Sequence, residues 1–171
     1  DLRHARRVID ALLPDEPDAE VRAAIERAVC GAVAALDPIV PHLPMQAGHF
    51  DITDDNVLRG YGELLPDAVI DFGDVMRSWR VAEIAVTASS VLHHDGADPT
   101  SVIPAIRAFH ARRHLTDEEI TALWPLVVLR GATLVLSGRA QVRLDDANEY
   151  AADALDRERR IFDVATSVPA S

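Results

Sequence analysis

Two polar segments decide the fold: GHFDITDDNVL, residues 48–58, and AVIDFGD, residues 68–74. The first places Asp51, Asp54 and Asp55 beside a histidine and an asparagine, with no lysine or arginine among them. Carboxylates this close together repel one another unless water solvates them or a cation neutralises them. A bound metal ion is the first candidate for such a cation.

The chain between these segments predicts a small β-hairpin. Short apolar pieces at 57–58 and 68–70 flank the turn-rich sequence at 60–62, which is typical of two strands joined by a loop. The acidic segment leads into the first strand, and the second strand ends at Asp71. The hairpin therefore brings residues that are distant in sequence to the same place.

The polar residues of the two segments form an ordered pattern. His49, Asp51 and Asn56 read H-x-D-x-x-x-x-N, and Asp71 opens the triplet D-F-G, which is the order of the catalytic and metal loops in protein-kinase-like folds. Phosphoryl transfer needs one carboxylate to orient the attacking hydroxyl and accept its proton, and oxygen ligands for magnesium. Asp51 suits the first role, and Asn56 and Asp71 suit the second. The alternative interpretation is a solvated acidic loop followed by an unrelated turn.

Read together, these segments resemble the aminoglycoside phosphotransferase and choline kinase superfamily, especially its hydroxylysine-kinase-like branch, where H-G-D-I-x-D-x-N and V-I-D-F-G-D are typical. SWRVAEIAV, residues 78–86, is similar to the helix that follows the metal loop in that branch. The resemblance implies a mainly α fold, the helical carboxy-terminal lobe of a protein-kinase-like fold, in which the small β-hairpin carries the catalytic and metal loops. Phe50 stands where the family usually has glycine.

The same resemblance implies an activity and roles for individual residues. The activity is transfer of the γ-phosphoryl group of ATP or GTP, with Mg²⁺, to a hydroxyl of a small, often cationic, amino-bearing substrate. Asp51 and His49 would be catalytic, with His49 orienting the loop rather than moving a proton. Asn56, Asp71 and Asp74 would bind the cofactor, the first two as magnesium ligands. Asp74 is equally placed to cap the turn into the next helix.

The nucleotide-clamping lobe of such a fold, with its glycine-rich loop, lysine and glutamate, should precede residue 1. It is absent from this sequence, and all 17 basic residues are arginine. We therefore expect a single helical lobe that is a fragment of a longer polypeptide. Residues 1–45 would form helices and a proline-rich connection, 46–76 the catalytic and metal-binding hairpin, and 77–171 a helical subdomain. The missing lobe or other parent domains would be partners, and the apolar surface left exposed favours a homodimer.

An alternative function is a non-catalytic kinase-like binding or regulatory module of a multidomain protein, for example one fused to a class III aminotransferase. Aminotransferase chemistry needs a Schiff-base lysine and a Walker A loop needs a phosphate-binding lysine, so neither site can be completed by this chain. The presence of the base and both metal ligands favours the enzyme.

Composition excludes other classes of partner. The net charge is −11, which disfavours nucleic acid or an anionic membrane as the main partner and favours cations. The most apolar stretch, 123–136, is interrupted by Pro125, Arg130 and Gly131, so we expect a buried helix and not a membrane span. No signal sequence opens the chain, and its single cysteine, Cys30, favours a reducing cytoplasm. Cys30 is expected to be a small core residue.

Helical spacing of apolar residues predicts the remaining elements, with caps that fix some boundaries. Asp15 is expected to cap the second helix, and Thr116 with Glu119 forms a capping box for the longest one. The predicted helices cover residues 2–13, 17–36, 79–92, 100–113, 116–144 and 147–165.

Two further polar pairs have simple structural interpretations. Glu83 and Arg80 are expected to form an internal ion pair. His110 and His114 have the i, i+4 spacing of paired zinc ligands, but they lack the glutamate of the H-E-x-x-H pattern. We expect that histidine pair to be a solvent-facing helix end.

Overall fold

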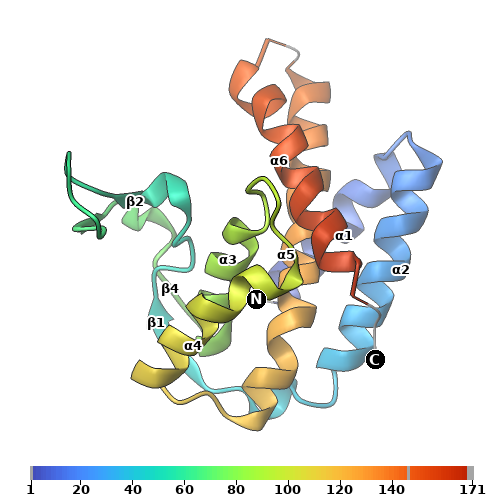
Figure 1. Ribbon diagram of the computed structural model, residues 1–171. Coiled ribbons are helices and arrows are strands. Elements are labelled where there is room, and N and C mark those ends of the chain that lie inside the picture. The colour runs from blue at the N-terminus through green and yellow to red at the C-terminus, as the bar shows by residue number, and fades with distance from the viewer. Residues whose placement is uncertain (1, 146, 169–171) are drawn as a thin grey trace.

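Helix α5 (Asp117–Leu144) is the centre of the fold, and α1, α2, α3 and α6 pack against it (Figure 1). The structure, a computed structural model, describes residues 2–145 and 147–168. The predicted capping box is confirmed, because the Thr116 hydroxyl accepts from the Glu119 amide and the Glu119 carboxylate accepts from the Thr116 amide. Within those residues α5 alone has the length and apolar composition of a membrane span, and half of that window is buried in the protein. Core helices share this property.

The chain is mainly α, as predicted. The other helices are α1 (Leu2–Leu12), α2 (Ala19–Leu36), α3 (Arg80–Val91), α4 (Ile103–Arg112) and α6 (Glu149–Thr166). The core consists of buried aliphatic side chains of α5 and of the helix faces that meet it, such as Leu136 of α5, Ile25 and Leu36 of α2, and Val81 of α3. Each of these positions belongs to a 3.6-residue apolar repeat, so burial of one helix face explains the packing.

Two small antiparallel sheets carry the loops of interest. Strand β2 (Val57–Leu58) pairs with β3 (Ala68–Val69), so the predicted hairpin is confirmed. It projects away from the helical body (Figure 1). The second pair joins β1 (Met45–Gly48) to β4 (Met76–Trp79). This second pair was not predicted, because no turn signal links two segments so far apart in sequence.

Buried ion pairs connect elements at both ends of α5. At one end Glu16, which is fully buried, accepts from Arg139 Nε at 2.9 Å and Nη2 at 2.7 Å. At the other end buried Glu119 pairs with Arg80, at the start of α3. The predicted pair between Arg80 and Glu83 is therefore wrong. Arg80 pairs instead with the buried carboxylate of Glu119 on α5. The Glu83 carboxylate accepts hydrogen bonds from the loop described below.

Several local boundaries differ from the sequence prediction. Helix α2 starts at Ala19 because the Asp18 side chain, and not that of Asp15, accepts from the first free amides. A short 3₁₀ helix (Val40–His42) interrupts the proline-rich connection. Cys30 is exposed, so its assignment to the core was wrong.

Candidate active site

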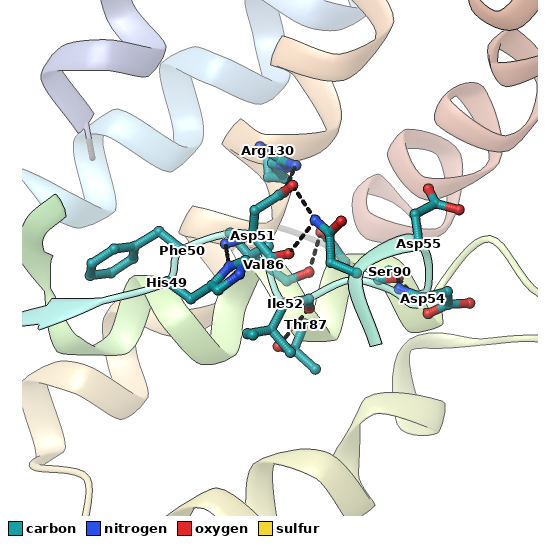
Figure 2. A network of polar contacts seen from close by, with 12 residues as sticks. His49, Phe50, Asp51, Ile52, Asp54, Asp55, Val86, Thr87, Ser90 and Arg130 are labelled. Atoms are coloured by element: carbon teal, nitrogen blue, oxygen red, sulfur yellow. Dashed lines mark hydrogen bonds and ion pairs between the residues drawn. The ribbon is translucent and has the colours of Figure 1, made fainter. Parts of the chain in front are cut away.

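The Asp51 carboxylate is held by two donors from different parts of the chain (Figure 2). Arg130 Nη2 donates to Oδ1 at 3.0 Å, and Asn56 Nδ2 donates to Oδ2 at 2.8 Å. Asn56 Nδ2 also donates to the Asp51 carbonyl at 2.9 Å. The carboxylate is only partly exposed, and these contacts fix its orientation.

The imidazole of His49 connects the catalytic loop to the strand before Asp71. Nδ1 accepts from the Asp51 amide at 3.3 Å, so Nε2 carries the proton and donates to the Ile70 carbonyl at 2.8 Å. The ring is buried and lies edge-on to Phe72, with centroids 5.0 Å apart. Both ring nitrogens of His49 are therefore engaged within the protein, and the ring links residues 51 and 70.

The metal loop is held beside the catalytic loop through the backbone of the same residue, Ile70. The Ile70 amide donates to the Asn56 carbonyl at 3.0 Å, so catalytic-loop residues hold Ile70 on both sides. Asp71 follows in a left-handed conformation (φ 58°, ψ 67°), which is uncommon for a residue with a Cβ. This conformation turns the chain into a 3₁₀ turn that includes the Asp74 backbone, while the Asp74 side chain lies outside the described structure.

Phe50, the departure from the family pattern, also has a positive φ of 59°. A left-handed backbone costs a side-chain-bearing residue roughly 1–2 kcal/mol, whereas burying a phenyl ring contributes about 1.5–3 kcal/mol. The Phe50 ring is buried, so burial offsets the strain. Its amide donates to both carboxylate oxygens of Glu83, at 3.2 and 3.3 Å. Gly48 allows this approach, since a Cβ there would lie 2.1 Å from Glu83 Oε2.

Side chains on one face of α3 hydrogen-bond to the backbone of the catalytic loop at three positions, residues 50, 52 and 54. Besides Glu83, Thr87 Oγ1 donates to the Ile52 carbonyl at 3.0 Å, and Ser90 Oγ accepts from the Asp54 amide at 3.2 Å. Residues 83, 87 and 90 are spaced four and three apart, so they lie on one side of the helix. Polar residues at this spacing within an otherwise apolar helix were an available sequence signal that this face binds a polar partner.

The crowded carboxylates of the catalytic loop are matched by basic side chains from elsewhere. The basic partners come from α5, from the end of α3 and from α6, far from the loop in sequence. The pairs are Asp51 with Arg130 at 3.0 Å, Asp54 with His94 at 2.8 Å and Asp55 with Arg157 at 3.3 Å. Two guanidinium groups of the protein, from Arg130 and Arg157, therefore neutralise part of the negative charge of this loop.

A cavity of about 240 Å³ lies at this site. Asp51, Asn56 and Asp71 all line it, so the structure brings three predicted residues to one space. Its far wall is formed by α5 and α6, which contribute Arg130 and Glu158 among others. Neither of these two residues was predicted as part of a site, because both lie in helices whose patterns indicate only packing.

Glu158 differs from the other acids around this cavity. Burial raises the pKa of its carboxyl to about 7, against the opposing effect of Arg157 and Arg130. Its Oε2 is buried without a hydrogen-bond partner in the described structure, as is Arg130 Nε. An unpaired buried carboxylate oxygen at a cavity wall is costly unless a donor meets it. A positively charged ligand group would provide that donor.

The donor set fits a magnesium ion at the predicted position. Both hydrogen bonds of the Asn56 side chain use Nδ2, which leaves Oδ1 for a cation. The Asp71 carboxylate is exposed, and its one described contact is a long 3.4 Å bond from the Gly73 amide to Oδ1. An amide oxygen and a carboxylate oxygen are ligands that Mg²⁺ prefers.

Comparison with known proteins gives one positive result. The model of the phosphotransferase enzyme family, APH, matches residues 1–124, while neither the curated proteins nor the solved structures give a match. The matched segment contains both loops and α3, and it ends within α5 before Arg130. Since it covers most of the 171 residues, the chain belongs to the phosphotransferase enzyme family.

Proposed function

We propose that this lobe catalyses transfer of the γ-phosphoryl group of ATP or GTP to a hydroxyl of a small, amino-bearing molecule. Membership of the phosphotransferase family supports the reaction class. The observation that carries the proposal for this chain is that Asp51, Asn56 and Asp71 line one cavity. Such convergence is what in-line phosphoryl transfer requires of a protein.

In this proposal Asp51 orients the acceptor hydroxyl and takes its proton. The contacts from Arg130 and Asn56 hold the carboxylate in one direction, so little reorganisation is needed when the acceptor arrives. His49 fixes the loop through its bonds to the Asp51 amide and the Ile70 carbonyl. The proton is expected to move from the hydroxyl oxygen to a carboxylate oxygen of Asp51 as the phosphoryl group is transferred.

Asn56 Oδ1 and the Asp71 carboxylate would hold magnesium, and Asp74 would assist in binding the nucleotide. The ion neutralises charge on the phosphate oxygens when it is bound. The link from the Ile70 amide to the Asn56 carbonyl supports this assignment, because it keeps the two ligand-bearing loops together.

Glu158 is our candidate for recognition of the acceptor's amino group. Glu158 lines the same cavity as Asp51, so an acceptor bound there could place its hydroxyl at Asp51 and its cation at Glu158. This arrangement supports a cationic amino alcohol over a neutral or anionic acceptor.

We further propose that the phosphate-anchoring lysine comes from a polypeptide segment outside these 171 residues, which contain none. The exposed apolar side chains on the hairpin and metal loop support this idea, since they form a surface that another lobe or a second copy could cover. They include Tyr61, Leu64, Leu65, Phe72 and Val75. The intact mass of the natural protein, compared with 18.6 kDa, and its sedimentation would separate these partners.

One observation favours the alternative, a binding or regulatory module that does not catalyse. Arg130 and Asn56 each already donate to one oxygen of the Asp51 carboxylate, so an acceptor hydroxyl would have to share an oxygen with one of them. The activity test therefore has to distinguish binding from turnover.

The test is a phosphoryl-transfer assay on the natural polypeptide that contains this lobe. It is incubated with Mg·ATP or Mg·GTP and a panel of hydroxylated amines, and phosphomonoester product is detected by mass spectrometry. Magnesium-dependent product with an amino-alcohol acceptor is the expected result. Acceptor binding without product for any member of the panel would favour the non-catalytic module instead.

A pH dependence of acceptor binding is expected from Glu158. Because burial raises the pKa of this carboxyl to about 7, it is mostly neutral at pH 6 and mostly ionised at pH 8. Affinity for a cation should therefore rise about tenfold over that interval, following the ionised fraction. A primary amino alcohol is the suitable ligand, since its ammonium group can donate to the carboxylate and stays charged up to pH 8, and calorimetry gives the dissociation constant.

The control for this experiment is Glu158→Gln, which keeps the shape of the side chain and removes its titration. Arg130 and Arg157 also face Glu158, but they stay charged throughout this range, whereas His93 lines the same cavity and can titrate. Weak, pH-independent binding by Glu158→Gln would assign the effect to Glu158. A slope that persists in this variant would assign it to another group such as His93.

A further inference from the structure

Asp54, His93 and His94 form a cluster beside the cavity. The His94 Nε2 atom lies 2.8 Å from Asp54 Oδ2, and the His93 Nε2 atom lies 3.5 Å from the same oxygen. One ligand atom from each residue lies within 4.8 Å of the others, and no other group of three such side chains meets this test among the described residues. The site differs in residues and chemistry from the magnesium position of Asn56 and Asp71.

The spacing of these atoms fits a shared transition-metal ion. Zinc lies about 2.0–2.1 Å from imidazole nitrogens and carboxylate oxygens, so two ligands in a tetrahedral site are about 3.3 Å apart. The separations of 3.5 and 2.8 Å from Asp54 Oδ2 to the two histidine nitrogens fall on either side of that value. Two imidazoles with one carboxylate favour zinc and related transition metals over magnesium, which prefers oxygen ligands alone.

Ser90 holds one of the three ligands, Asp54, in place. Its hydroxyl donates to Asp54 Oδ1 at 2.7 Å (Figure 2). The other carboxylate oxygen, Oδ2, is the one that contacts the histidines. Outer contacts of this kind orient metal ligands and raise affinity.

We propose that Asp54, His93 and His94 bind a transition-metal ion, with Zn²⁺ as the reference ion, and that this ion fastens the catalytic loop to the end of α3. Asp54 and Asn56 belong to the same 3₁₀ helix (Asp54–Asn56), so an ion at Asp54 restrains the residue that carries the magnesium-binding amide. The histidines directly follow α3, whose Ser90 already contacts the loop. The position of Asn56 would therefore depend on whether the metal ion is bound at Asp54, His93 and His94.

The other histidine pair of the chain provides a matched control. His110 and His114 have ring centroids 4.2 Å apart, close to the 4.3 Å of His93 and His94. His110 Nδ1 accepts from the Leu115 amide, and no acidic side chain completes this pair into a group of three within the described residues. Replacing both rings tests whether adjacent histidines alone are sufficient.

The experiment is calorimetric titration of Zn²⁺ into the tag-free, chelator-treated natural protein, without nucleotide and in excess Mg²⁺. Wild type and the double variant His110→Ala/His114→Ala are expected to bind one equivalent equally well. His94→Ala and Asp54→Asn are expected to bind at least about tenfold more weakly. His94 is more than half exposed, so its replacement should not impair folding, which circular dichroism checks.

Cobalt substitution gives an independent readout of geometry. Co²⁺ should produce visible d–d absorption typical of low coordination number in wild type and in the His110 control, and not in His94→Ala. Absence of Zn²⁺ binding by wild type, or loss of binding only in the His110→Ala/His114→Ala variant, would overturn the proposal. Competition by Mg²⁺ would also overturn it, since it would place the zinc on the oxygen ligands Asn56 and Asp71.

Discussion

Replacing Asp51 by asparagine is expected to lower kcat for phosphoryl transfer by about 10³-fold, within the range that a positioned general base contributes. Asparagine keeps the shape of the side chain and one oxygen, so Asn56 can still donate to it. It loses the negative charge that Arg130 contacts and the site that accepts the proton. Steady-state rates with the natural polypeptide measure the loss, and nucleotide affinity should be nearly unchanged because other residues hold the cofactor.

The matched control is Asp163→Asn, which removes a carboxylate from an exposed position on α6. Asp163 pairs with Arg159 one helical turn away, and neither lines the cavity. It should retain the wild-type rate. A wild-type rate in Asp51→Asn would remove Asp51 from the mechanism, whereas an equal loss in both variants would point to a general effect of charge. Thermal denaturation of both proteins separates loss of chemistry from loss of folding.

Much of the site was predictable because its signal is local. The motif that places His49, Asp51 and Asn56 spans eight residues, and the hairpin that returns the chain to Asp71 has its own strand and turn signals. The capping box at Thr116 is likewise encoded within four residues. Local patterns of this kind determine backbone geometry before any tertiary contact forms, so the sequence alone reveals them.

The remaining parts of the site depend on contacts between distant residues. Arg130 reaches Asp51 across 79 positions and lies in a helix that reads as a packing element. Glu158 gains its raised pKa from burial that only the docking of α6 creates. The wrong pairing of Arg80 with Glu83 has the same origin, since helical spacing allowed that pair and the tertiary fold gave each residue a different partner. Sequence spacing indicates which contacts are possible but not which one forms.

A large loss of stability is expected from Arg139→Met. Glu16 is fully buried, and the Arg139 guanidinium donates to both of its oxygens, which lowers the pKa of this carboxyl. Removing one partner of a buried ion pair typically costs about 3–5 kcal/mol, because the remaining charge stays buried with neither water nor an opposite charge to compensate it. The Asp18 amide and Arg143 still contact Glu16, so we expect a loss of about 2–3 kcal/mol in the free energy of unfolding. Urea denaturation at neutral pH measures it.

Three comparisons separate this mechanism from loss of packing. Arg159→Met breaks an exposed pair and should cost at most about 0.5 kcal/mol. The double variant Glu16→Gln/Arg139→Met should be more stable than Arg139→Met, because it no longer buries a charge; equal or lower stability would contradict the mechanism. Since the folded pKa of Glu16 is lowered, its contribution is present above the unfolded value of 4.5 and lost as pH falls through the folded value. The gap between wild type and Arg139→Met should therefore narrow in acid.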